Sequence, residues 1–275
     1  TGNNAVSGQT VTVMPAELRR MVCEVAFAAS VDESSQRFTN VQIELNENRL
    51  KMVATDGYRL AIATGEALGG ELREPVLIPA RTMELVIGML GDADPETPVQ
   101  MVLPENNTAQ VVFAFSGPTS GRRATVQSVE VVAQRYAGKF PDYRAIIPKN
   151  TITRSVVPVA PFLRALKTSA LFVKNQANIV QIALKPGEPG ALTVAASGGD
   201  DLGDVCNEIE AVIEGDPLEM SFNVKYLSEY LAQCDAPEFE MRTTMPTRPA
   251  QMVPVGAEVG ESMHVIMPMH PPREQ

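Results

Sequence analysis

The stretch "TVTVMPAELRRMVCEVAF", residues 10–27, decides the fold, because a second stretch, "SVVPVAPFLRALKTSALF", residues 155–172, repeats its pattern. In each stretch, alternating apolar residues typical of a strand precede a proline, and apolar residues at helical spacing follow it. Proline is tolerated in the first turn of a helix. We therefore expect each stretch to be a strand followed by a helix, with the helices at 15–29 and 161–174.

Further blocks recur in the same order in both halves of the chain. A hairpin pattern, a strand–helix pattern and a second hairpin pattern are shared, in the pairs 40–55 and 178–197, 74–90 and 218–234, and 98–115 and 238–255. This order predicts an α+β fold made of two tandem copies of one domain, each with two helices packed on antiparallel strands. We expect a flexible lead at 1–9, domains at 10–150 and 151–275, and a loop insertion at 116–123 in the first copy only.

The composition is that of an ordinary globular protein, with 44% hydrophobic and 20% charged residues among 275. The net charge of -10 means that DNA binding would need basic residues gathered on one face. We see no signal peptide and no apolar run long enough to span a bilayer, so we expect no membrane partner. The cysteines, Cys23, Cys206 and Cys234, are few and widely spaced, which fits a reducing, cytoplasmic setting.

Enzyme classes find little support. Both histidines, His264 and His270, lie in the last dozen positions, and no convincing Ser/His/Asp order exists. There is no glycine-rich phosphate-binding loop. With two histidines and no clustered cysteines, we expect no metal site and no cofactor. The sequence therefore predicts a non-enzymatic protein without catalytic residues.

A turn in the first half is followed by residues that the second half lacks. In "VATDGYRLA", residues 53–61, Asp56-Gly57 is most simply a turn. Tyr58-Arg59 follows it, whereas the second copy has Ser197-Gly198-Gly199-Asp200 at the matching place. A residue that the fold needs should appear in both copies. The Tyr-Arg pair therefore indicates a role that belongs to the first copy alone.

Three stretches resemble one family. "VATDGYRLA" (53–61), "GKFPDYRAIIPKN" (138–150) and "VIMPMH" (265–270) are similar to bacterial DNA polymerase III beta subunits, the sliding clamps, and the resemblance covers 11–270. The resemblance implies that the copies are the second and third clamp domains. Family members have three such domains per chain and close as ring-shaped homodimers around DNA. We expect the first domain to be missing here, and this chain to be a monomer or weak oligomer.

The implied function is that of a processivity factor. The resemblance implies sequence-independent binding to double-stranded DNA and docking of the DNA polymerase III alpha subunit, the clamp loader and other proteins with clamp-binding motifs. The alternative is a clamp-derived peptide-binding module or fragment that does not encircle DNA. The docking groove carried over from the family consists of Phe38, Thr55, Gly57, Tyr58, Arg59, Leu60, Pro141, Ala145, Ile146, Asn223, Tyr226, Pro249, Val265, Met267, Pro268 and Met269.

Some groove positions depart from the family pattern. Many relatives have His at Tyr58, Arg at Ala145 and Arg-Leu at His270-Pro271, so we expect different peptide preferences here. The tail at 271–275 could partly cover the groove. Without the resemblance, the run 267–269 would be an ordinary terminal strand.

Basic residues on the helices are the predicted DNA contacts. The family lines its central hole with these helices, which contact the DNA backbone without reading sequence. The residues concerned are Arg19, Arg20, Arg81, Arg164, Lys167, Lys174 and Lys225. The alternative is a solvated helix face, since Lys225 and Glu229 form an i,i+4 pair and other acids share these helices.

Overall fold

The computed structural model describes residues 8–117, 128–173, 178–199, 203–257 and 261–270. Lys174, Asp200, the tail at 271–275 and most of the predicted insertion lie outside these ranges. The chain divides into two compact units, which are Thr1–Gly57 with Ala61–Pro141, and Tyr58–Leu60 with Asp142–Gln275. In the described residues, no helix is long and apolar enough to cross a membrane.

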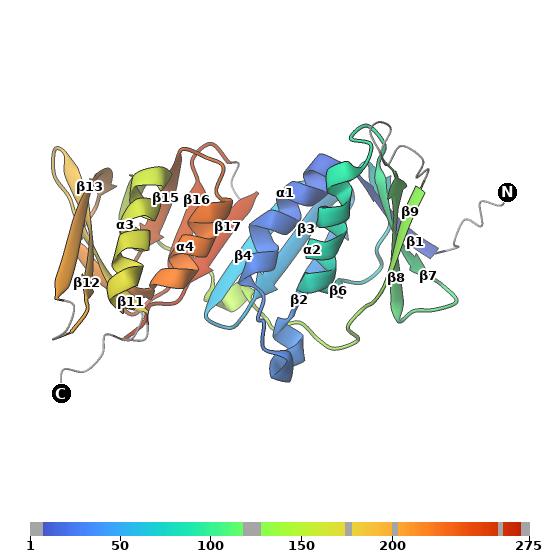
Figure 1. Cartoon of the computed structure of the whole chain (residues 1–275), viewed down its shortest axis with the longest axis horizontal. Coiled ribbons are helices and arrows are strands. Elements are labelled where there is room, and N and C mark those ends of the chain that lie inside the picture. The colour runs from blue at the N-terminus through green and yellow to red at the C-terminus, as the bar shows by residue number, and fades with distance from the viewer. Residues whose placement is uncertain (1–7, 118–127, 174–177, 200–202, 258–260, 271–275) are drawn as a thin grey trace. The chain divides into compact units, whose positions relative to one another are not determined.

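The first unit contains two helices and two runs of antiparallel strands (Figure 1). Its elements in chain order are β1 (Gly8–Val13), α1 (Pro15–Val25), η1 (Ala26–Ala28), η2 (Glu33–Phe38), β2 (Asn40–Asn46), β3 (Arg49–Thr55), β4 (Arg59–Glu66), β5 (Gly69–Gly70), β6 (Val76–Pro79), α2 (Ala80–Met89), η3 (Leu90–Asp92), β7 (Val99–Pro104), β8 (Gln110–Ser116) and β9 (Ser128–Gln134). The strand orders are β5-β1-β7-β8-β9 and β4-β3-β2-β6.

The second unit begins with η4 (Arg144–Ile146) and repeats this succession of elements. They are β10 (Thr153–Pro158), α3 (Val159–Val173), β11 (Ile179–Lys185), β12 (Gly190–Ser197), β13 (Asp204–Glu214), β14 (Leu218–Asn223), α4 (Val224–Gln233), β15 (Glu238–Thr243), β16 (Ala250–Pro254) and β17 (Ser262–Ile266). The strand order is β14-β11-β12-β13-β10-β15-β16-β17.

The two strand orders match, which confirms that the chain holds two copies of one α+β fold. In the second unit, β10 is equivalent to β1 of the first unit. In the same way, β14, β11 and β12 are equivalent to β6, β2 and β3. The long strand β13 pairs with both β12 and β10, whereas the first unit divides these pairings between β4 and β5. The helices α1 and α2 contact each other in one unit, and α3 and α4 do so in the other (Figure 1).

The apolar stripes predicted for the first helix of each copy form the cores. Leu18, Met21 and Val22 of α1 are buried, as are Phe162 and Leu166 of α3. Burying one such side chain is worth about 1.5–3 kcal/mol. The cores thus hold the helices against the strands in both units.

The ends of the predicted elements shift by a few residues. The first helix ends at Val25, and the tighter turn η1 continues it only to Ala28. Helix α3 begins at Val159, earlier than predicted, and the Val159 amide, which has no acceptor within the helix, donates to Pro237 O at 2.9 Å. β1 begins at Gly8, so the last two residues of the predicted lead are strand residues paired with β7.

The division between the units lies earlier than the repeat suggests. The segment 142–150 belongs to the second unit, where the side chain of Tyr143 is buried. Directly after the segment, the Ile152 amide donates to Thr243 O at 2.9 Å and Thr153 pairs with Thr243 in the β10–β15 ladder, so its C-terminal end is anchored in the second unit. Sequence repetition cannot reveal this, because the segment has no counterpart within the repeated blocks.

Candidate functional site

The residues after the Asp56-Gly57 turn belong to the second unit rather than to the copy in which the sequence places them. Tyr58 O accepts a hydrogen bond from the Met267 amide at 2.9 Å. The Tyr58 side chain is 58% exposed, whereas that of Arg59 is only 5% exposed. The turn thus presents an aromatic ring beside the C-terminal segment and buries the cation that follows it.

Arg59 is an internal positioning residue in the second unit. Its guanidinium lies 4.5 Å from the centre of the Tyr226 ring, and its Nη1 forms an ion pair with Glu229. Glu229 also lies 3.7 Å from the Lys225 ammonium, the i,i+4 pair expected from the sequence. A buried charge needs such a partner, and the stacked guanidinium also orients the ring. These two contacts lie within the second unit, and the expected role of Arg59 in holding polar groups of a peptide stays a prediction.

Asn223 also has a local role. Its Oδ1 accepts a hydrogen bond from the Lys225 amide at 2.9 Å, so it caps the N-terminus of α4. This cap fixes the start of the helix that carries Tyr226 and Glu229. Asn223 therefore stabilises the first turn of α4, in which Tyr226 lies.

A buried histidine lies near Arg59. The His264 ring is fully buried and stacks on Tyr230 with 4.9 Å between ring centres. Burial, and then the nearby Arg59 charge, lower the pKa of His264 to about 3. The ring is therefore uncharged at neutral pH and adds no second positive charge beside Arg59. Sequence reasoning missed both Glu229 and His264 as partners of Arg59, because no spacing links them to it.

Some predicted groove residues in and near the C-terminal segment are exposed, and others are buried. Met267, Pro268 and Met269 are partly exposed, and the Met269 amide donates to Ser221 O at 2.7 Å. Leu60 and Val265 are almost completely buried. Of these predicted groove residues, the two methionines are accessible to a partner, whereas Leu60 and Val265 are not.

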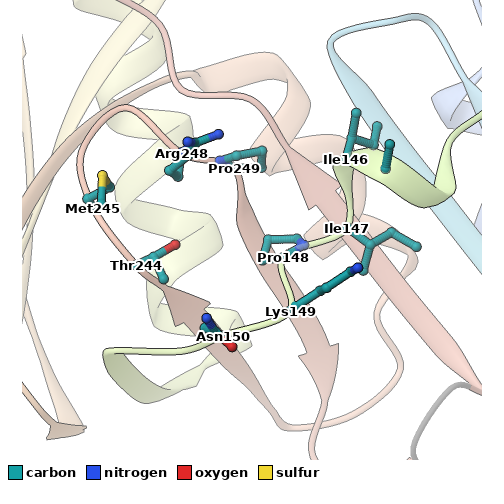
Figure 2. A pocket seen from close by; sticks show the side chains of 10 residues that line it. Ile146, Ile147, Pro148, Lys149, Asn150, Thr244, Met245, Arg248 and Pro249 are labelled. Atoms are coloured by element: carbon teal, nitrogen blue, oxygen red, sulfur yellow. The ribbon is translucent and has the colours of Figure 1, made fainter.

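A pocket of about 310 Å³ lies in the second unit (Figure 2). It includes Ala145, Ile146 and Pro249 from the predicted groove. The full lining is Ala145, Ile146, Ile147, Pro148, Lys149, Asn150, Thr244, Met245, Arg248 and Pro249. The pocket forms where the β10–β15 ladder ends at Thr153 and Thr243, because the chain diverges there on both sides. Its volume is at the lower end of the range for ligand sites.

The remaining predicted groove residues, Phe38, Thr55, Gly57 and Pro141, belong to the first unit. The Gly57 amide donates to Thr55 Oγ1 at 3.0 Å, and the φ angle of Gly57 is 93°. A Cβ atom at this glycine would lie 3.6 Å from the Phe38 ring. Glycine is needed here mainly because residues with a side chain rarely adopt this positive φ angle.

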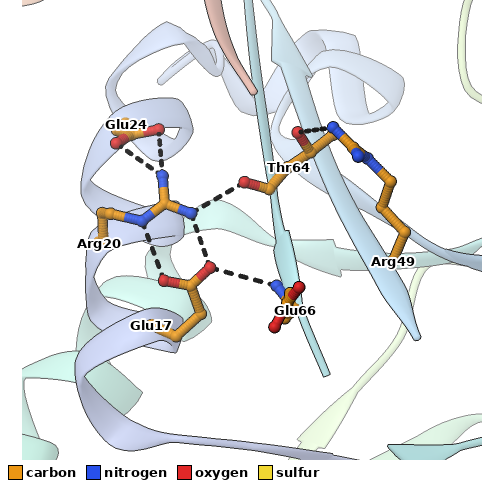
Figure 3. A network of polar contacts seen from close by, with 6 residues as sticks. All are labelled: Glu17, Arg20, Glu24, Arg49, Thr64 and Glu66. Carbon is orange, nitrogen blue, oxygen red and sulfur yellow. Dashed lines mark hydrogen bonds and ion pairs between the residues drawn. The ribbon is translucent and has the colours of Figure 1, made fainter. Parts of the chain in front are cut away.

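Arg20, one of the predicted DNA contacts, is held in an internal network (Figure 3). Its guanidinium contacts Glu17 at 2.7 Å and Glu24 at 2.9 Å, and it donates to Thr64 O at 2.8 Å. The hydrogen bond that Arg20 donates to Glu17 is the main reason that the pKa of Arg20 is raised. Two carboxylates therefore offset its charge, and its contact with DNA stays a prediction.

The other basic helix residues differ between the units. Arg19 donates to Ile87 O at 2.8 Å, and Arg81 is exposed on α2. Arg164 and Lys167 are exposed on α3, whose described residues include no acid. Neither of them is in an ion pair with a residue that the structure describes. The predicted contact Lys174 lies outside the described residues. Helix α3 thus carries two exposed cations and, among its described residues, no acid that would offset them.

Comparisons with known proteins agree with this architecture. A family model described as the central domain of the DNA polymerase III beta subunit matches residues 12–142, and one described as its C-terminal domain matches residues 144–270. The beta sliding clamp of Streptomyces coelicolor is 28% identical over 254 residues, which cover 90% of this chain and 63% of that protein. The beta sliding clamp of Caulobacter vibrioides is 29% identical over 259 residues, with 92% and 63% covered.

Solved structures show the same relationship. The crystal structure of the DNA polymerase III beta subunit from Thermotoga maritima matches with a TM-score of 0.81 and 26% identity, over 98% of this chain and 68% of that one. The sliding clamp from Bacillus subtilis, at 24% identity and a TM-score of 0.82, supports the fold over 96% of this chain and 65% of that one. This chain spans less than two thirds of the length of the curated relatives that it matches. It belongs to the DNA polymerase III beta subunit family, of which it contains the central and C-terminal domains.

Proposed function

We propose that this chain is the partner-binding part of a DNA sliding clamp, and that short linear peptides of replication and repair proteins dock on its second unit. The observation that carries the proposal is the meeting of Tyr58, Tyr226 and the segment 267–269 within that unit, although they are far apart in sequence. The relatives named beta sliding clamp support the same reading.

The exposed side chains suit an apolar peptide. Two methionines can adapt their shape to leucine or phenylalanine side chains, and the Tyr58 ring offers a broad apolar face. Arg59 and Glu229 fix the Tyr226 ring before a partner arrives, which lowers the entropy lost on binding. A small site of this kind should bind a peptide of the Gln-Leu-x-Leu-Phe type with micromolar affinity, about -8 kcal/mol.

Fluorescence anisotropy with a labelled Gln-Leu-Ser-Leu-Phe peptide tests this proposal. Met269→Ala together with Tyr58→Ala should weaken binding by about 2 kcal/mol, because both truncations remove apolar contact. We avoid Leu60→Ala, since truncating a buried leucine destabilises the fold itself. Met89→Ala, at an exposed methionine of the first unit, is the matched control. Equal affinities for the double variant and the control would refute the site.

DNA is the second proposed partner, and α3 is the proposed contact. Removing two phosphate contacts should reduce the slope of log K against log salt by about 1.8. Arg164→Gln with Lys167→Gln should show this change with double-stranded DNA, whereas Arg20→Gln should not, because Glu17 and Glu24 already offset its charge. Equal slopes for all variants would argue against α3.

The remaining functional statements are also proposals. We propose a tethering role without catalysis, with the DNA polymerase III alpha subunit and the clamp loader among the peptide-bearing partners. Among the described residues, no group of His, Cys, Asp or Glu could hold a metal ion. The weak self-association expected from the sequence stays a prediction, which sedimentation at micromolar concentration would test.

A further inference from the structure

The pocket in Figure 2 combines an apolar lining with positive charge. Ile146, Ile147 and Met245 supply apolar surface, and Lys149 and Arg248 add two cations. None of the lining residues is acidic. Neither cation is in an ion pair with any residue that the structure describes, and both side chains are exposed. Their charge is therefore available to a ligand.

This local charge contrasts with that of the whole chain, which is -10. An acidic partner is repelled by most of such a surface. Its carboxylates therefore bind preferentially at a small positively charged region. The apolar lining favours a partner that has an apolar side chain close to the carboxylate. Charge complementarity thus favours an acidic peptide segment over a basic or neutral one.

The pocket walls are held in place before any ligand arrives. On one side, the Thr153–Thr243 pairing and the hydrogen bond from Ile152 to Thr243 fix the end of the segment 145–150. On the other side, the Arg248 amide donates to Met245 O at 3.0 Å and closes a turn with Pro246 at its second position. A preformed wall reduces the entropy lost when a flexible peptide binds.

We propose that this pocket binds acidic residues that flank the apolar motif in a partner peptide. The proposal rests on the proposed peptide-binding function and deepens it, because Ala145, Ile146 and Pro249 belong to both the predicted groove and the pocket. Lys149 and Arg248 are then specificity residues that favour partners with Asp or Glu beside the motif. Neither was among the residues carried over from the family.

Three labelled peptides test this proposal on the full chain. One contains only Gln-Leu-Ser-Leu-Phe, the second adds Asp-Glu-Asp at each end, and the third adds Asn-Gln-Asn at each end. The acidic extensions should tighten binding about fivefold over the neutral ones at low salt, as expected for two exposed ion pairs, and the gain should fade as salt rises. Lys149→Gln with Arg248→Gln should abolish the gain and leave the affinity for the neutral peptides unchanged.

A second double variant controls for total charge. Arg73→Gln with Lys185→Gln removes the same charge from exposed positions outside the pocket and should keep the fivefold gain. If the gain is absent, or survives in the pocket variant, the inference is wrong even though the neutral peptides bind. If no neutral peptide binds, the proposed function fails instead. Binding of the acidic peptide alone, lost in the pocket variant, would then still support the pocket.

Discussion

Acid should destabilise the second unit through His264. Its pKa is about 3 in the folded protein, against an ordinary value of 6.5. Between these values the unfolded chain binds a proton that the folded chain does not, so the stability is present above pH 6.5 and falls as the pH is lowered towards 3. The loss is about 1.4 kcal/mol per pH unit in this window, or about 2 kcal/mol between pH 6.5 and pH 5.

Urea unfolding at pH 7 and pH 5 measures this loss, and carboxylates that titrate in the same range require a reference variant. His264→Phe keeps a ring that can stack on Tyr230 but cannot bind a proton. The free energy of unfolding of the wild type should therefore fall by about 2 kcal/mol more than that of the variant over this pH range. Equal losses in the two proteins would show that His264 is not buried in its neutral form, and would refute the reasoning.

The other predictions concern stability. Glu229→Ala should lower the free energy of unfolding by about 3 kcal/mol, because it removes the carboxylate that offsets the buried Arg59 charge, whereas Lys225→Ala should change it by under about 0.5 kcal/mol. Similar losses in the two variants, measured by urea unfolding, would contradict the role given to Glu229. Gly57→Ala should cost about 1 kcal/mol through its positive φ, while Gly88→Ala, inside α2 with open space around it, should be neutral or stabilising. Thermal unfolding should show a lower midpoint for Gly57→Ala and an unchanged or higher midpoint for Gly88→Ala, and equal decreases would contradict this reasoning.

Much of the fold could be predicted because the chain presents its pattern twice. The prolines at 15 and 161, the apolar stripes and the matched hairpins place α1 and α3 in equivalent positions. Periodicity did not predict that α1 ends at Val25 or that α3 begins at Val159, because contacts with other parts of the fold also determine helix ends.

The candidate site was less accessible to sequence reasoning. The resemblance singled out Tyr58 and Met269, which the structure leaves exposed or partly exposed in one unit. It could not show that Arg59 is buried against Glu229, since the two residues are 170 positions apart. It also could not separate Arg20, which neighbouring carboxylates offset, from Arg164, because the number of charges on a helix does not reveal their partners.

The location of peptide binding is the most direct test of the account. The chain has 13 methionines, and carbon-13 labelling of their methyl groups gives each one a separate NMR signal. On titration with Gln-Leu-Ser-Leu-Phe, the methyl signals of Met267 and Met269 should shift and saturate together at micromolar peptide, while those of Met21 and Met89 in the first unit should stay in place. Saturable binding that leaves the Met267 and Met269 signals unmoved would contradict the account.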